Sequence, residues 1–377
     1  MASAPTESPF ADRSLLDPDA IPPAFDHRDA TREALRTVLS PALWGSGPAT
    51  ALIAGPPGAG KRTAVAVTVD RAERPGDRPG PTLVPVACEP ETTGYELAIA
   101  ATNTLVGDGV LATSGYTRET AFRRLRHWIT QAAGPPVFRL DGADRLDPAE
   151  LEVFLGVLFE ESVACGVVAV ADDASIRERF PRGVLDRFHG EIGVPPYDEA
   201  TERAILADRA EHAFEAGACP DETIDRALGL SDERGLRTAL ELLDAAGDLA
   251  RAAGADVVDP THVDRADRDL RAERLRERIE DCSRHERLVL GAVLDGEGEH
   301  RFADILERYR DRCAAVDVDP NRKRSVHNYL DALVEAGLLA AERRRSADAG
   351  THFAYRPGVD RDALEGVLDA VNRSERR

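Results

Sequence analysis

Residues 49–64 read ATALIAGPPGAGKRTA, and this stretch decides the fold of the first half of the chain. Residues 49–54 are apolar and are followed by Gly and Pro, which is typical of a buried strand. Gly55 to Lys61 have G-x-x-x-x-G-K spacing, and the apolar run over residues 63–69 predicts a helix. Glycines between a strand and a helix let backbone N–H groups converge on phosphate oxygens, whose charge the helix N-terminus favours. The stretch therefore predicts a phosphate-binding loop.

Lys61 is predicted to reach the outer phosphates of a bound ligand. It is one of only two lysines in the chain, the other being Lys323, while 46 of the 48 basic residues are arginine. A lysine in this position of an arginine-rich chain indicates a need for a compact point charge. The alternative is a glycine-rich turn that binds no ligand.

The residue after this lysine departs from the usual pattern. A Ser or Thr hydroxyl normally follows the lysine and binds Mg²⁺. Here Arg62 follows, and the hydroxyl comes one residue later at Thr63, which on a helix turns it by about 100°. We expect a Mg²⁺ site built on Thr63 and Asp141 to be weakened.

An acidic element follows a second predicted strand, residues 137–140. Asp141 at its end is placed to hold Mg²⁺ through water. The next residue is Gly142, where a carboxylate would activate the attacking water, and Asp144 is the remaining substitute. Loss of a general base costs roughly 10²–10⁴-fold in rate. Arg139, inside the strand, is expected to pair with a local carboxylate.

Three regions follow one another along the chain. Residues 25–195 alternate strands and helices, which predicts a parallel sheet covered by helices on both faces. Residues 196–280 carry helical patterns and no strand signal, and residues 281–372 read as three helices and a hairpin, the pattern of a winged helix-turn-helix. Residues 1–24, rich in Pro, Ser and Asp, predict a flexible tail. The predicted strands are 49–54, 82–87, 137–140 and 167–171, and the predicted helices between them are 94–105, 117–132 and 148–163.

Basic residues gather on two elements of the last region. The third helix, residues 321–336, opens with a basic run, and the hairpin tip carries three arginines. Recognition helices present their first residues to the major groove, and a basic tip suits the minor groove or the backbone of DNA. The alternative is a solvated arginine-rich surface. The candidate DNA-binding residues are Arg322, Lys323, Arg324, Ser325, Asn328, Arg343, Arg344 and Arg345.

Composition limits the class of protein. A hydrophobic content of 42% excludes wholesale disorder, and the net charge of −20 argues against a basic protein that coats nucleic acid. The acidic excess is not spread evenly along the chain, because residues 271–377 hold nearly equal numbers of charges, 21 basic and 22 acidic residues. An acidic excess with Arg in place of Lys resembles the proteome of salt-loving archaea. The scattered cysteines indicate neither zinc nor disulfides. No run is long enough to span a membrane, so we expect a cytoplasmic protein without a membrane partner.

The ordered set of motifs resembles archaeal replication initiators related to origin recognition complex subunit one and cell division control protein six. These are AAA+ ATPases with a C-terminal winged helix, and the resemblance runs from about residue 25 to 370. It implies an α/β AAA+ core, an all-helical lid and a winged helix. The blocks that carry it are residues 27–29, 55–65, 140–146, 168–173, 185–187, 194–197, 204–214 and 237–250.

The resemblance also assigns roles to residues. It implies that ATP or ADP is bound and that Arg237 is the sensor-two arginine. Arg187 is a candidate arginine finger, with a plain surface arginine as the equal alternative. The residues implied to contact nucleotide are Gly58, Ala59, Gly60, Lys61, Arg62, Thr63 and Ala64 from the loop, and Tyr197 and Arg209 from the lid side.

Four positions depart from the family pattern. Besides Arg62 and Gly142, Asp172 stands where the family has a sensor-one Asn, so an anion lies where phosphate is bound. Residues 234–235 read RG where the family has Gly-Asp. The leading hypothesis is a degenerate paralogue that binds origin-type double-stranded DNA and ATP or ADP, with slow or absent hydrolysis.

Two other hypotheses remain open. One is a hydrolysing initiator that uses Thr63 and Asp144 in place of the missing groups. The other is a nucleotide-independent regulatory scaffold that binds DNA or a protein partner. Other initiator paralogues and a replicative helicase are further candidate partners.

Overall fold

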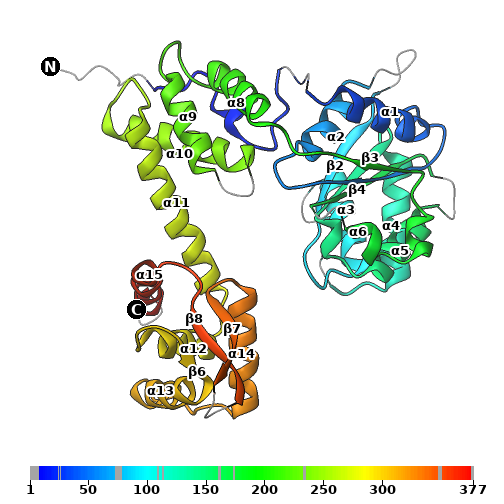
Figure 1. The fold of residues 1–377 in the computed structure, drawn as a ribbon. Coiled ribbons are helices and arrows are strands. Elements are labelled where there is room, and N and C mark those ends of the chain that lie inside the picture. The colour runs from blue at the N-terminus through cyan, green and yellow to red at the C-terminus, as the bar shows by residue number, and fades with distance from the viewer. Residues whose placement is uncertain are drawn as a thin grey trace. The chain divides into compact units, whose positions relative to one another are not determined.

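Figure 1 shows the computed structural model of the chain, which describes residues 8–23, 25, 27–72, 79–107, 110–112, 114–159, 163–172, 175–231, 235–346 and 350–374. The chain forms two compact units, Met1–Val263 and Asp264–Arg377. In the described part, no helix is both long and apolar enough to cross a membrane.

A five-stranded parallel sheet forms the centre of the first unit, in the order β2-β3-β4-β1-β5. Its carboxyl edge gathers the predicted site: the phosphate loop follows β1, Asp141 ends β3, and Asp172 follows β4. The short edge strand β5 was not predicted. The strands are β1 Ala49–Ala54, β2 Thr82–Ala87, β3 Pro136–Asp141, β4 Gly166–Ala171 and β5 Gly190–Gly193.

Helices cover both faces of this sheet, as predicted (Figure 1). Because side chains alternate along a strand, Leu52 of β1 joins the core under α3, α4 and α5, while Ile53 joins the core under α1 and α2. The helices are α1 Asp29–Leu43, α2 Lys61–Asp70, α3 Gly94–Val106, α4 Arg118–Gln131, α5 Pro148–Phe159, α6 Ile176–Arg179 and α7 Arg182–Leu185, with the 3₁₀ helix η2 at Ala143–Arg145.

Helices follow the sheet, as the sequence predicted for the lid. Asp198 caps α8 by accepting a hydrogen bond from the backbone N–H of Thr201, and the apolar side of α10 is buried against its neighbours. Pro195 and Pro196 form the link from β5 to this group. The helices are α8 Glu199–Ala213, α9 Asp221–Leu230, α10 Leu236–Ala253 and α11 Pro260–Glu280.

The prediction of a flexible tail over residues 1–24 is wrong for residues 8–23. This segment contains the 3₁₀ helix η1, Arg13–Leu16, and packs on α8 and α10. The ring of Phe10 stacks on that of Phe214 with 5.1 Å between centroids, and Arg13 pairs with Asp244 and Asp248. Residues 1–7 and 24 lie outside the described residues. A few specific anchors fix the segment, so its composition alone was misleading.

The second unit is the predicted winged helix. Three helices enclose a core that includes Tyr309, Leu330 and Leu333, and a three-stranded antiparallel sheet runs in the order β6-β8-β7. Strand β6 and the closing helix α15 were not predicted. The elements are α12 Arg284–Leu294, β6 His300–Arg301, α13 Phe302–Ala315, α14 Lys323–Glu335, β7 Leu339–Ser346, β8 Gly350–Pro357 and α15 Arg361–Ser374.

The hairpin is longer than predicted, which corrects the placement of its arginines. Arg343, Arg344 and Arg345 lie in β7, paired with Phe353, His352 and Thr351 of β8, and not at the tip. Charged residues are poor indicators of a strand, yet the backbone hydrogen bonds of a ladder do not depend on side-chain polarity. Residues 347–349 and the Arg345 side chain lie outside the described part.

Candidate functional site

The phosphate loop has the backbone shape that its glycines allow. Gly58 and Gly60 adopt left-handed conformations with φ of 75° and 79°, and Gly60 caps α2. A Cβ atom at Gly60 would collide with the hydroxyl of Tyr197. The loop is thus shaped to bring backbone N–H groups to an anion at the N-terminus of α2.

Lys61 is buried and fully engaged with protein groups. Its Nζ donates to the carbonyl oxygens of Gly55 and Pro56 at 2.7 and 2.6 Å and forms an ion pair with Asp172 at 2.8 Å. Burial lowers the pKa of Lys61, while the hydrogen bond and charge of Asp172 act in the opposite direction. Asp172 therefore neutralises the charge of Lys61.

Asp141 is engaged by two arginines. The guanidinium of Arg139 donates to both of its oxygens, with Nε–Oδ1 and Nη2–Oδ2 distances of 2.9 Å. Arg139 and Asp141 are two apart on β3 and share a face of the sheet, which confirms the predicted pairing of Arg139. Arg62 approaches from α2, with its Nε 3.3 Å from Oδ1. Both oxygens of the Asp141 carboxylate therefore lie against guanidinium groups.

These residues do not fit the Mg²⁺ ion that the fold family implies. Two guanidinium groups already lie against Asp141 and would repel a cation there, and Arg62 stands where the family places a hydroxyl. Across the described segments, no cluster of three His, Cys, Asp or Glu side chains is placed to hold a metal ion.

Gly142, where the family has a carboxylate, and its candidate substitute Asp144 both lie near the loop that follows β4. Gly142 has a φ of 80°, and a Cβ there would lie 3.2 Å from the carbonyl oxygen of Cys88. A carboxylate residue would therefore be strained at this position. Asp144 accepts a hydrogen bond from the backbone N–H of Asp172 at 3.3 Å, so the sheet order brings it next to the ion pair of Lys61.

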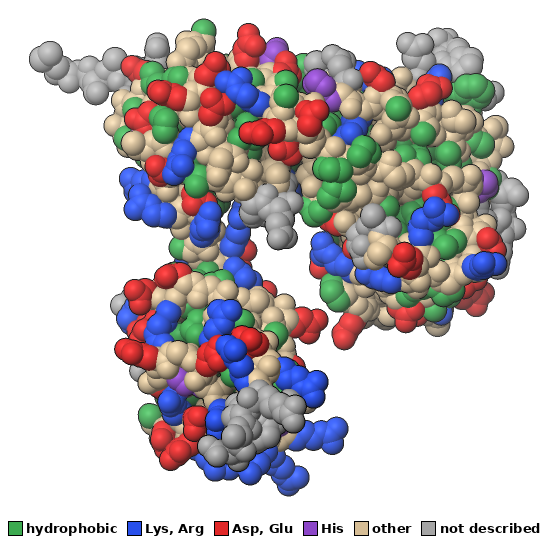
Figure 2. Space-filling model, viewed as in Figure 1, with side chains coloured by type: hydrophobic (Ala, Val, Ile, Leu, Met, Phe, Trp, Pro, Cys, Tyr) green, Lys and Arg blue, Asp and Glu red, His purple; other side chains and the backbone are tan. Residues whose placement is uncertain are grey.

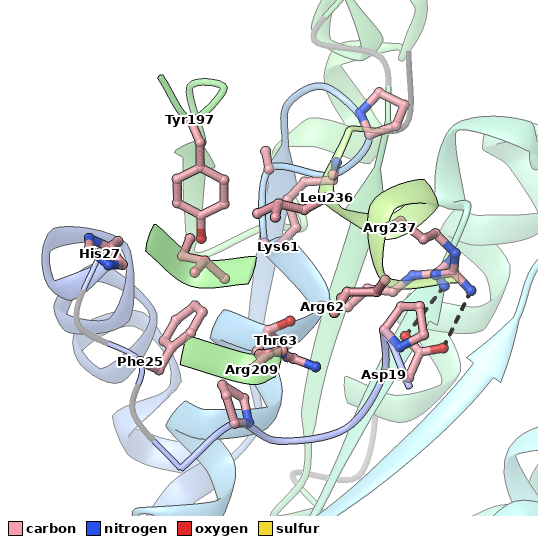
Figure 3. A pocket seen from close by; sticks show the side chains of 18 of the residues that line it. Asp19, Phe25, His27, Lys61, Arg62, Thr63, Tyr197, Arg209, Leu236 and Arg237 are labelled. Atoms are coloured by element: carbon pink, nitrogen blue, oxygen red, sulfur yellow. Dashed lines mark ion pairs between the residues drawn. The ribbon is translucent and has the colours of Figure 1, made fainter. Parts of the chain in front are cut away.

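A cavity of about 500 Å³ lies between the phosphate loop and the lid (Figure 3). Both charged groups and apolar side chains such as Phe25, Ile205, Leu236 and Leu240 line it, a combination that suits a nucleotide. Ala64 is buried behind the loop. The predicted residues that line the cavity are Gly58, Ala59, Gly60, Lys61, Arg62, Thr63, Asp172, Tyr197, Arg209 and Arg237.

Asp19 of the N-terminal segment enters this cavity, and sequence reasoning missed it. Dashed lines in Figure 3 mark its ion pairs with the guanidinium groups of Arg62 and Arg237, each at 3.7 Å. Arg237 also pairs with Glu241 at 3.3 Å. The only signal in the sequence was that an acidic segment precedes the core, which does not single out one aspartate.

Arg28 also has a role that the sequence did not reveal. It donates to the carbonyl oxygens of Ala59 and Pro195 at 3.0 and 2.7 Å, and its guanidinium lies 3.7 Å from the ring centroid of Tyr197. Burial raises the pKa of Tyr197. Arg28 thus ties the phosphate loop to the link that leads into the lid.

Arg209 holds the N-terminal segment in place. Its guanidinium donates to the carbonyl oxygens of Leu15, Asp17 and Ala20 at 3.0–3.1 Å. Its buried Nε has no hydrogen-bond partner among the described atoms, and burial lowers the pKa of the side chain. Arg209 lines the cavity, but most of its donors already have protein acceptors.

Arg187 lies on the surface beside Glu152, at 3.5 Å, and is not among the described residues that line the cavity. Its role as an arginine finger stays a prediction. Residue 173, which ends one block of the family resemblance, lies outside the described residues. So does residue 234, which is one of the departures from the family pattern.

The second unit presents an exposed basic surface. Arg322 caps α14 at its N-terminus, and Arg322, Lys323, Arg324 and Asn328 are exposed, while Ser325 is half-buried. Figure 2 shows Lys and Arg side chains gathered at the lower end of this unit. In the described part of the chain, no carboxylate lies within ion-pair distance of Arg322, Lys323 or Arg324.

The two described arginines of β7 differ in their surroundings. Arg344 pairs with Glu299 at 2.9 Å and with Glu342 at 3.0 Å. Arg343 is exposed, and no described carboxylate lies within ion-pair distance of it. Because side chains alternate along a strand, these arginines extend to opposite faces of the hairpin.

Two family models match consecutive parts of the chain. Residues 203–268 match the Cdc6 AAA+ ATPase-type lid domain, and residues 277–366 match the CDC6, C terminal winged helix domain. ORC1-type DNA replication protein 15 of Haloarcula marismortui is 27% identical, and the alignment covers 96% of this chain and 93% of that protein. ORC1-type DNA replication protein 10 of Halobacterium salinarum is 26% identical, with 96% and 91% covered.

Solved structures share the fold. The Aeropyrum pernix ORC1 protein in complex with DNA superposes with a TM-score of 0.82 at 24% identity, covering 96% of this chain and 97% of that one. The Aeropyrum pernix ORC2 protein, in ADPNP–ADP complexes, gives 0.58 at 21%, covering 97% and 98%. The chain is therefore similar to Orc1/Cdc6 replication proteins over nearly its full length, with a Cdc6-type lid domain and a CDC6-type C-terminal winged helix.

Proposed function

We propose that this chain is a replication initiator that binds origin duplex DNA through its winged helix and holds ATP or ADP between core and lid, with slow or absent hydrolysis. The observation that carries the proposal is the exposed basic opening of α14. A cytoplasmic location, and association with other initiator paralogues or a replicative helicase, go with this role.

The charges of α14 differ from those of several other arginines in this acidic protein. Arg118 is neutralised by Glu150 and Arg312 by Asp295. Around Arg322, Lys323 and Arg324 no described carboxylate does this. Arg324 and Asn328 are four apart on the helix and share a face, so both can reach base edges in one groove.

The relatives give independent support for DNA as the partner. Aeropyrum pernix ORC1, whose fold the chain shares, was solved in complex with DNA. The second unit also carries almost no net charge, so the overall charge of −20 does not repel DNA from this surface.

Fluorescence anisotropy in concentrated KCl tests DNA binding. Labelled duplexes carrying an origin sequence from the source genome, or the same bases in shuffled order, are titrated with the full chain. Arg322→Ala or Asn328→Ala should weaken binding to the origin duplex by about 1–3 kcal/mol. The matched control is Arg276→Ala, because Arg276 is already paired with Glu280 on α11. Unchanged affinity after loss of Arg322, Arg324 and Asn328 together would reject the winged helix as the DNA-binding element.

The cavity supports a nucleotide clamp. Phosphates would lie on the loop against Lys61, with Arg237 approaching from the lid, and the base would lie among the apolar side chains beside Tyr197. A ligand that contacts both core and lid stabilises their closed arrangement by mass action. The lack of a carboxylate at Gly142, where a side chain would be strained, and the anionic Asp172 are the observations that favour slow hydrolysis.

A steady-state ATPase assay of the purified chain tests the hydrolysis part of the proposal. We expect turnover near the background of a Lys61→Ala variant, whose folding is checked by its thermal melting curve. Turnover typical of active AAA+ enzymes, abolished in Lys61→Ala, would instead favour an initiator that uses Thr63 and Asp144. Absence of ADP or ATP binding at any salt concentration would favour the nucleotide-independent scaffold.

A further inference from the structure

We propose that Arg62 takes the place of the divalent cation, so that this site binds nucleoside diphosphates without Mg²⁺. The inference rests on the proposed nucleotide binding and extends it to the chemistry of the counter-ion. It follows from the misfit between the residues around Asp141 and a magnesium site.

The first observation is where Arg62 directs its guanidinium. It leaves the first turn of α2, one residue after the lysine of the phosphate loop, and its Nε lies 3.3 Å from Oδ1 of Asp141. Its Nη1 lies 3.7 Å from Oδ1 of Asp19 on the N-terminal segment. Arg62 therefore lines the cavity and also contacts Asp141, which is not among the described residues that line it.

The second observation is the charge of the cluster. Asp141 together with Arg139 and Arg62 carries a net charge of +1, which is the charge of one carboxylate with a Mg²⁺ ion. Arg139 is fixed by two short hydrogen bonds and is only 6% exposed, so it supplies a permanent part of this charge. Arg62, at 30% exposure, is the arginine that remains accessible to a ligand.

The third observation is that a carboxylate of the N-terminal segment lies beside both Arg62 and Arg237. Asp19 lies 3.7 Å from both Arg62 and Arg237, which exceeds hydrogen-bond length, and its side chain is 40% exposed. A phosphate group offers more oxygens and more charge than Asp19 and can receive paired N–H donors from a guanidinium. Exchange of Asp19 for phosphate would leave Arg62 bridging Asp141 and the ligand, as a metal ion would.

Isothermal titration calorimetry with ADP tests the inference directly. The full chain in concentrated KCl is titrated once with Mg²⁺ and once with EDTA. We expect the two dissociation constants to agree within about twofold, because the counter-ion is part of the chain. Binding that weakens about tenfold or more in EDTA overturns the inference and leaves the proposed nucleotide clamp intact. Absence of binding in both buffers rejects the proposed nucleotide function itself.

Arg62→Ser supplies the second arm, since it removes the charge and restores the hydroxyl. We expect it to weaken ADP binding in EDTA by about tenfold, the loss of one charge-assisted hydrogen bond. Arg36→Ser is the matched control, because Arg36 lies on the exposed face of α1 and, among the described residues, pairs only with Glu33. Unchanged ADP binding of folded Arg62→Ser in EDTA overturns the assignment to Arg62.

Discussion

Asp172 decides how the phosphate loop responds to a ligand. Its carboxylate is 43% exposed, whereas its partner Lys61 is 4% exposed, so the lysine cannot turn to solvent when the pair breaks. The terminal phosphate of ATP would be repelled by this carboxylate as it approaches Lys61. ADP lacks that phosphate, so the repulsion would be smaller. Repulsion between like charges a few ångströms apart is on the order of 1–4 kcal/mol near a protein surface.

Asp172→Asn should therefore strengthen the binding of ATP relative to ADP. We expect the ratio of the two affinities to shift by about tenfold toward ATP at neutral pH. The comparison is made by competition with a fluorescent nucleotide. Asp70→Asn is the charge-matched control, because Asp70 lies at the exposed end of α2, the helix that begins with Lys61. Equal gains for ATP and ADP would mean that Asp172 acts on the loop as a whole.

The same variant should change the pH dependence of binding. Phosphate binding needs the charged ammonium of Lys61, so it is present below the pKa of Lys61 and lost as pH rises through it. Burial already lowers that pKa, and the hydrogen bond and charge of Asp172 oppose the lowering. Without Asp172 the pKa falls further, and ADP affinity should decline at a lower pH than in the parent chain. Titrations from neutral pH to about pH 10 measure this, and coincident profiles would contradict it.

The N-terminal segment is an element whose position depends on single contacts. Phe10 stacks on Phe214 over α10, and a Cβ at Gly247 of that helix would overlap the Phe10 ring. Arg209 holds the same segment from α8 through three carbonyl oxygens. These anchors also place Asp19 in the cavity, so docking of the segment and the charge of the nucleotide site are linked.

Gly247→Ala should release Phe10 and loosen this segment. Overpacking at a tight contact costs about 1–3 kcal/mol, although alanine favours a helix. Chemical denaturation measures the loss, and limited proteolysis should cut residues 8–23 faster. Gly229→Ala in α9 is the control, because nothing lies within 4 Å of its added Cβ and stability should stay equal or rise slightly. Equal behaviour of the two variants would reject the packing of Phe10.

The hairpin of β7 and β8 allows two neighbouring arginines to be compared. Arg344 is neutralised by Glu299 and Glu342, whereas Arg343 has no described carboxylate partner. Arg343→Ala should lower affinity for all duplexes and reduce the salt dependence of log K by about 1, while Arg344→Ala should change both much less. Anisotropy titrations over a range of KCl concentrations distinguish them. An equal effect of the two substitutions would place Arg344, and not only Arg343, on the DNA.

Elements with a regular pattern were predictable, and contacts between elements were not. The phosphate loop and the pairing of Arg139 with Asp141 follow from local spacing, because residues two apart share a face of a strand. The contacts of Arg62 with Asp141 and of Lys61 with Asp172 depend on β1 lying beside β4, and β4 beside β3. A single sequence does not give that order, so it indicated that these positions are altered but not what replaced their function.

For the whole molecule, the distribution of charge matters more than its total. The first unit, residues 1–263, holds 25 basic and 43 acidic residues, and residues 264–377 hold 23 and 25. Self-repulsion of like charges destabilises a compact unit and is screened by salt. The Debye length is about 3 Å in 1 M salt and about 10 Å in 0.1 M, so dilution exposes the first unit to repulsion that the second largely avoids.

Lowering KCl should therefore destabilise the first unit more than the second. Hydrogen exchange followed by mass spectrometry, on the full chain in concentrated and in dilute KCl, reports both units in one sample. We expect protection in β1, β3 and α10 to fall as KCl is removed, while α12 and α14 serve as the internal control and change little. The core of the first unit contains the nucleotide site, so ADP should restore part of its protection in dilute salt by mass action. An equal loss of protection in the two units would show that salt acts through a feature they share, such as apolar burial, and not through the acidic excess of residues 1–263.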